Sequence, residues 1–147
     1  NDSFAERNTN FFTLGPRVDY RALDWLTVML TYLYERGLAD GHKDTQFADD
    51  VSYYLHMVSA GTEFRLNRQW DLGFTYIHRR KTFTSGLAGD THVGRFDATH
   101  QGIAELRYHM SAAATVMLSF QYGKRTSTNA LRDFQDSILS IGGQYRF

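Results

Sequence analysis

The sequence predicts an all-β chain, built as an antiparallel, up-and-down sheet of long strands. Three observations indicate this fold. Apolar and polar residues alternate with period two over most of the chain, which is typical of strands with one apolar face. Short and long connections follow one another in turn, and aromatic residues gather near both ends of the expected strands.

The composition excludes several classes of protein. The chain has 147 residues, a formal net charge of +0 and no cysteine, so it has no disulfide framework and no thiolate metal site. A neutral chain also lacks the broad positive footprint of a nucleic-acid-binding protein, and no nucleic acid is expected as a partner. No apolar run approaches the ~18 residues of a transmembrane helix. The polar opening Asn1-Asp2-Ser3 is unlike a signal peptide.

The alternation predicts strands over residues 10–22, 25–36, 50–66, 69–82, 98–110, 113–125 and 135–147. The third of these changes phase, because Val51, Tyr53 and Leu55 follow one phase and the apolar residues from Val58 onward follow the other. We expect a β-bulge near His56 and Met57 that restores a single apolar face. No segment keeps a helical period, so almost no helix is expected.

Two kinds of connection join these strands. Tight turns are expected at residues 22–24, 66–68 and 110–112, and longer loops at 37–49, 83–97 and 126–134. Short periplasmic turns and longer extracellular loops are typical of transmembrane β-barrels. A soluble ligand-binding barrel shares the alternation but turns its apolar face inward. The expected strands exceed the common length of about five or six residues and reach the roughly 9–11 residues that a bilayer requires.

Aromatic residues fall into two groups, with aliphatic residues and glycine between them. Near the short turns lie Tyr20, Trp25, Phe64, Trp70, Tyr108 and Phe147, and near the long loops lie Phe12, Tyr32, Tyr34, Tyr53, Tyr76, Phe120 and Tyr122. Two aromatic belts around an aliphatic band are typical of a protein that crosses two membrane interfaces. Aromatic residues are also favoured in any strand, which leaves an ordinary core stripe as the alternative.

The opposite face of the expected strands is charged. It carries Arg17, Asp19, Arg21, Glu35, Glu63, Arg65, Asp71, Arg79, Lys81, Glu105, Arg107, Arg125 and Arg146. A soluble core would not bury these groups, whereas the solvated face of a soluble sheet and a lumen would hold them equally well. With the membrane barrel as the predicted fold, we expect them to line a lumen. Eight of them are cations and five are anions, and the surplus of three positive charges favours anions in an open lumen.

The end of the chain carries an alternating apolar motif, formed by Leu139, Ile141, Gly143, Tyr145 and Phe147. It resembles the C-terminal strand signature of bacterial outer-membrane barrels, which the barrel-assembly machinery recognises. The turns at residues 23–26 and 66–70 also look like those of large proteobacterial barrels. The resemblance is to barrels of exopolysaccharide export, of surface-lipoprotein assembly and of decahaem cytochrome conduits. It implies a Gram-negative outer membrane, with outer-membrane lipid and lipopolysaccharide as partners.

The histidines do not suggest a reaction or a metal site. The six histidines show neither an H-x-H nor an H-x-x-x-H spacing, and no metal or cofactor is expected. His100 with Asp97, or His42 with Asp44, would suit a hydrolytic centre near the outer rim. We prefer solvated loop positions for these residues and expect no enzyme activity.

These observations predict an outer-membrane β-barrel that acts as a conduit or scaffold for moving a substrate across the membrane. A structural sheath around a partner such as an electron-transfer cytochrome is the first alternative, and a soluble ligand-binding β-barrel is the second. Single-chain bacterial barrels have an even number of strands, and the chain offers about seven. Residues 1–9 are therefore expected to be the remnant of an extracellular loop, and residues 10–147 the C-terminal strands of a larger barrel. The remaining strands are expected to come from upstream sequence or from another chain.

Overall fold

The computed structural model describes residues 9–39, 42–43 and 48–146 of the chain. One large antiparallel sheet dominates it. The sheet contains β1 (Thr9–Leu14), β2 (Arg17–Leu23), β3 (Leu26–Ala39), β6 (Tyr53–Arg65), β7 (Trp70–Phe83), β8 (Phe96–His109), β9 (Ala114–Ser127) and β10 (Phe134–Tyr145). A second, two-stranded sheet pairs β4 (His42–Lys43) with β5 (Ala48–Asp49). The only helix in the described residues is a 3₁₀ turn at Ala130–Arg132.

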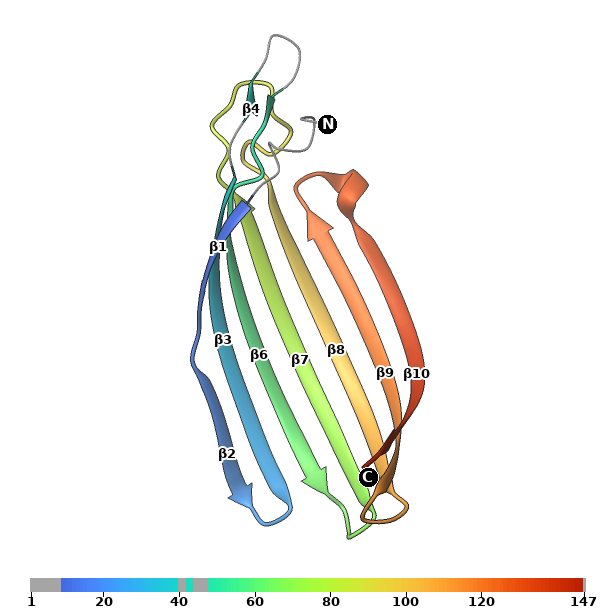
Figure 1. Ribbon diagram of the computed structural model, residues 1–147. Coiled ribbons are helices and arrows are strands. Elements are labelled where there is room, and N and C mark those ends of the chain that lie inside the picture. Colours follow the sequence, from blue (N-terminus) through green and yellow to red (C-terminus); the bar gives the residue numbers. More distant parts are fainter. Residues whose placement is uncertain (1–8, 40–41, 44–47, 147) are drawn as a thin grey trace.

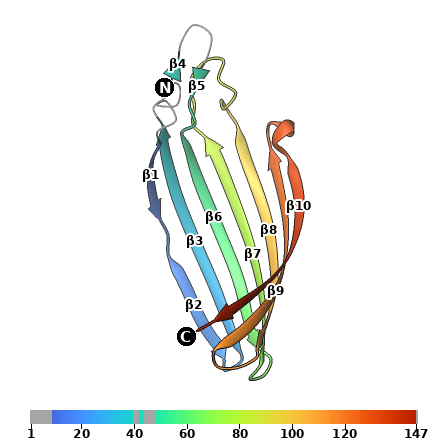
Figure 2. The same ribbon diagram turned by 45° about the vertical axis from the view of Figure 1, so that its right-hand side comes forward.

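The strands of the large sheet are ordered as β1-β3-β6-β7-β8-β9-β10, and β2 also pairs with β3. Each long strand pairs with the next long strand along the chain, so the predicted all-β, antiparallel, up-and-down fold is confirmed. The sheet is a curved wall with β1 and β2 at one edge and β10 at the other (Figures 1 and 2). In the part of the chain that the structure describes, these two edges do not pair with each other. The wall is open.

The first predicted strand is divided at Gly15 and Pro16. Both halves pair with β3 in one continuous register, from Thr9↔Ala39 to Arg21↔Thr27. Pro16 lacks an N–H group, so it cannot donate to the ladder, although its carbonyl accepts from the N–H of Tyr32 at 3.0 Å. An edge strand tolerates such a proline. The ladder shifts only beyond this point, between Arg21 and Leu23.

The bulge predicted near His56 and Met57 is absent, and that prediction is wrong. The pairing of β6 with β3 on one side and with β7 on the other proceeds without a register shift. With an unbroken pleat, Tyr53 lies on the charged side of the sheet, together with Leu55. Tyr53 therefore does not belong to an aromatic belt. It is 8% exposed and hydrogen-bonds to Glu35.

Side-chain acceptors close two of the tight turns. The Asn67 side chain accepts hydrogen bonds from the backbone N–H groups of Gln69 and Trp70 at 2.8 and 3.1 Å. The Ser111 hydroxyl accepts from Ala113 and Ala114 at 3.2 and 3.1 Å. Asn and Ser favour turns because they offer such local bonds. The three turns at this end are short, and the longer connections lie together at the other end (Figure 1). No helix of the described residues is long and apolar enough to cross a membrane.

Gly15 holds β1 and β2 on β3, because the backbone of β3 passes too close for a side chain. A Cβ atom at this position would collide with the carbonyl oxygen of Tyr32 and lie 2.8 Å from the Cα of Leu33. We expect Gly15→Ala to lower the free energy of unfolding by about 1–3 kcal/mol and to loosen the edge of the sheet. Urea titration and hydrogen exchange of β1 measure both effects.

Gly102 provides the control for this substitution. A Cβ atom there would meet nothing within 4 Å, so Gly102→Ala should cause no loss of stability. Equal stability of the two variants would contradict the role of Gly15.

Candidate functional site

The sheet has two faces of opposite chemistry, and the register decides which residue lies on which. In an antiparallel pair, residues that face each other across the ladder project to the same side. By this criterion the charged residues expected to line a lumen lie on one side, which we call the polar face; Arg146 lies just beyond the paired residues of β10. Among the described residues, no group of three or more His, Asp or Glu side chains could hold a metal ion.

An ion cluster crosses from β6 to β8 on the polar face, in the half of the strands nearer the short turns. Arg107 on β8 pairs with Glu63 on β6 at 3.0 Å and with Glu105 on its own strand. The Arg107 and Glu63 side chains are about one-third exposed, at 36% and 35%, so each pair contributes only about 0–1 kcal/mol. The cluster braces the wall between β6 and β8 and leaves little unpaired charge there.

A second contact braces the wall close to the short turns. The His109 ring lies 2.8 Å from the Asp71 carboxylate on β7 and 3.0 Å from the Thr115 hydroxyl on β9. These contacts place His109 across three neighbouring strands. Here too, charged and polar groups of adjacent strands are matched to each other.

The long-loop end of the polar face carries a buried carboxylate. Asp97 at the start of β8 pairs with Arg95 at 2.8 Å and with Arg125 on β9, and it also accepts a hydrogen bond from Ser127. The Arg95 and Asp97 side chains are 7% and 5% exposed. Asp97 is not available to His100, because the two residues differ by three positions along β8 and lie on opposite faces. The other pair considered for a hydrolytic centre, His42 and Asp44, lies outside the described side chains.

Aromatic rings hold a lysine beside this carboxylate. The Lys81 ammonium lies 3.6 Å from the centre of the Tyr53 ring and 4.9 Å from that of Phe83. The Tyr53 hydroxyl in turn donates to Glu35 at 2.6 Å. Cation–π contacts of this kind orient an ammonium group without neutralising it.

Residues 84–95 form an ordered loop that Asp90 ties to the sheet. Its carboxylate accepts hydrogen bonds from the backbone N–H groups of Asp50 and His92 at 2.9 and 2.8 Å. The ring of His92 lies 3.0 Å from the same carboxylate. Burial by itself would raise the pKa of the Asp90 carboxyl, but the hydrogen bonds from Ser85, His92 and Asp50 outweigh it and hold the pKa below its ordinary value.

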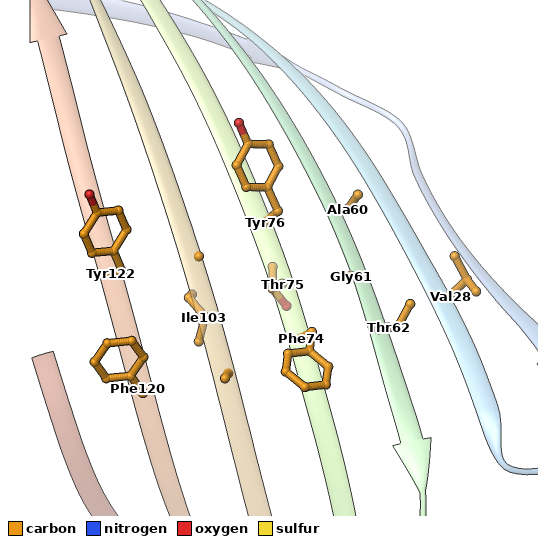
Figure 3. A pocket seen from close by; sticks show the side chains of 12 residues that line it. Val28, Ala60, Gly61, Thr62, Phe74, Thr75, Tyr76, Ile103, Phe120 and Tyr122 are labelled. Carbon is orange, nitrogen blue, oxygen red and sulfur yellow. The ribbon is translucent and has the colours of Figure 1, made fainter. Parts of the chain in front are cut away.

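The other face of the sheet is apolar and exposed. Leu30, Phe74 and Leu118 are 51%, 47% and 43% exposed, and Ile141 on β10 is 79% exposed. Between β7 and β9 the small residues Gly102 and Ala104 leave a hollow of about 480 Å³. Figure 3 shows aromatic rings on both sides of this hollow.

The register also locates the residues of the expected aromatic belts and of the C-terminal motif. Apart from Tyr53, the described belt residues lie on the apolar face or in the adjoining turn, where Trp25 stacks on Phe64 with ring centres 6.2 Å apart. Leu139, Ile141, Gly143 and Tyr145 share the apolar face of β10. Phe147 lies outside the described residues.

The apolar face ends in a basic band that the sequence reasoning missed. The band consists of Arg36, His56, His78, Arg80, His100 and Lys124, which occupy the long-loop ends of β3, β6, β7, β8 and β9. Tyrosines lie directly beside it: the hydroxyl of Tyr32 is 2.8 Å from the His56 ring, and that of Tyr76 is 2.6 Å from the His100 ring. The sequence signal for this band is that His, Arg and Lys, and not apolar residues, occupy every second position at the long-loop ends of these strands.

Comparisons of the chain with protein-family models, with curated proteins and with solved structures gave no match. A function for the sheet therefore has to be inferred from the side chains on its two faces.

We expect Asp97→Asn to destabilise the protein by about 3 kcal/mol, because it leaves the buried Arg95 and the partly exposed Arg125 without their carboxylate. Urea titration measures the change. Asp19→Asn is the matched control, since its ion pair with Arg17 is exposed, at 49% and 62%. That variant should lose far less stability than Asp97→Asn, because solvent screens an exposed pair. Equal losses in the two variants would contradict the structural role of Asp97.

Acid should release the loop at residues 84–95. The stabilisation from the Asp90 anion is complete above the ordinary carboxyl pKa of about 3.9 and is lost as the pH falls through the lower pKa of the folded state. Pepsin cleavage of the loop should therefore accelerate as the pH falls from about 4 to about 2.

Asp90→Asn serves as the control for this pH dependence. Pepsin should cleave the variant faster than the wild type. The cleavage rate of the variant should also depend less on pH, because position 90 then has no carboxyl group to protonate. Identical pH profiles for the two proteins would overturn the assignment.

Proposed function

We propose that the chain forms part of the wall of an outer-membrane β-barrel, which acts as a conduit or scaffold for moving a substrate across the membrane. One observation carries the proposal: the sheet exposes its apolar face and partly buries its charged one. Ile141 on the apolar face is 79% exposed, whereas the Asp71 side chain on the polar face is 13% exposed. A protein in water hides apolar surface, and a wall between lipid and an aqueous lumen needs the reverse.

The lengths of the strands support a membrane span. β3, β7, β8 and β9 have 14 residues each, β6 has 13 and β10 has 12. A bilayer requires about 9–11 residues in a tilted strand. The surplus leaves room for ends that project beyond the hydrocarbon.

The sequence of side chains along the apolar face supports the same proposal. Trp70 and Tyr108, whose ring centres lie 4.5 Å apart, stand at the short-turn end, and aliphatic residues follow. Tyrosines and then the basic band come at the long-loop end. Aromatic side chains favour the membrane interface, and cations beyond them would meet the phosphate groups of lipopolysaccharide.

The open edges require further strands in this setting. Within the described residues, the backbone groups of β1, β2 and β10 that point away from the sheet have no partner strand. In lipid each unsatisfied group costs several kcal/mol. The proposal therefore includes additional strands, from further sequence or from another chain, that close the barrel.

Arginine substitutions test which face meets lipid. Phe74→Arg should lower the free energy of unfolding in lipid vesicles by about 2–4 kcal/mol, because it places a charge at the middle of the bilayer. The matched control is Thr75→Arg, one residue along β7 and on the polar face, which should have a small effect. Urea titration of the protein in vesicles measures both.

Equal tolerance of arginine at the two positions would contradict the proposed span. A protein that stays fully soluble and folded without lipid or detergent would contradict it as well, and would favour a soluble barrel.

A further inference from the structure

The long-loop end of the polar face contains a cationic pocket. It has a volume of about 390 Å³ and is lined by side chains of β6, β7, β8 and β9, of the loop at 84–95 and of the 3₁₀ turn. Its charged lining residues are Arg79, Lys81, Arg95, Asp97, Arg125 and Arg132, and His92 also lines it. The volume lies within the range of small-molecule sites.

The cations of this pocket outnumber its carboxylates. Five of the lining residues are Arg or Lys and one is Asp, so five positive charges less one leave a surplus of four. Asp97 is already engaged by Arg95 and Arg125. In the described part of the chain, Arg79, Lys81 and Arg132 form no ion pair within 4.0 Å.

Two of these three cations have contacts that leave their charge unneutralised. Lys81 rests on the rings of Tyr53 and Phe83, and the Arg79 side chain contacts only the sulfur of Met57, at 3.5 Å, among the described hydrogen-bond partners. Arg95 lies over the Phe83 ring at 4.6 Å. Arg107, nearer the short turns, differs from these residues because it has two carboxylate partners.

We propose that this pocket binds a small polyanion, with two or more carboxylate or phosphate groups on a scaffold about the size of one sugar unit. Arginine guanidinium groups suit such ligands, since they bind carboxylates and phosphates through paired, charge-assisted hydrogen bonds. Fixed positive charge in a partly enclosed site also concentrates anions from solution. The inference deepens the proposed function, because the pocket lies on the face that would line the conduit and would select acidic substrates at its outer end.

Calorimetric titration of the folded protein with citrate and with inorganic pyrophosphate tests the binding. The double variant Arg79→Gln/Arg132→Gln should weaken the binding of both probes by about tenfold or more, because two charge-assisted contacts are lost. The two substituted residues take part in none of the described ion pairs, so the fold should persist. Tighter binding of citrate than of pyrophosphate would indicate a carboxylated ligand, and the reverse a phosphorylated one.

Arg65→Gln is the matched control, since Arg65 carries the same charge on the polar face at the other end of β6. It should change the affinity by less than about twofold. The inference is overturned if neither probe binds more tightly than chloride, or if Arg65→Gln weakens binding as much as the double variant.

Conductance in lipid bilayers separates this inference from the proposed function. Polyanion binding without membrane insertion would support the binding pocket and contradict the proposed conduit. Membrane insertion with no binding of either probe would support the conduit and contradict the pocket.

Discussion

The unbroken ladder from β3 to β10 is the constraint on which the two faces of the sheet depend. Side chains alternate along a strand, so a slip of one residue in any pairing would move that strand's apolar residues to the charged side. The pairings of β3 with β6 and of every later neighbour proceed without a shift. The single irregularity lies beside the first tight turn, between Arg21 and Leu23. One continuous register therefore gives every strand the same division between apolar and charged residues.

Different interactions position the side chains on the two faces of the sheet. On the polar face, neighbouring strands carry matched groups, such as Arg107 with Glu63 and His109 with Asp71. Such pairs fix the position of side chains more than they stabilise the fold, since each partly exposed pair contributes about 0–1 kcal/mol. On the apolar face, large rings on β7 and β9 flank small residues on β8. The exposure of this apolar face is the physical basis for proposing a membrane.

Charge is distributed unevenly along the polar face. Nearer the short turns Arg107 is paired with two carboxylates, whereas the long-loop end concentrates arginine and lysine around one engaged aspartate. The loop at residues 84–95 contributes to this end because Asp90 anchors it through backbone hydrogen bonds. Arg95 of this loop, together with the cations of β7, β9 and the 3₁₀ turn, creates a local positive potential that the neutral chain as a whole does not have.

The pattern of residues predicts the strands, the tight turns and, for most strands, the face on which each residue lies, because alternation with period two is a local property of the chain. The prediction fails at β6, where the apolar residues change phase and the backbone does not: β3 and β7 hold the strand from both sides, and Tyr53 is placed among charged groups. The contact of Asp97 with Arg125, and the meeting of Arg79 and Arg132 at one pocket, become visible in the folded chain alone. Partners across strands and across loops depend on register and on long-range contacts, which the local pattern of residues does not encode.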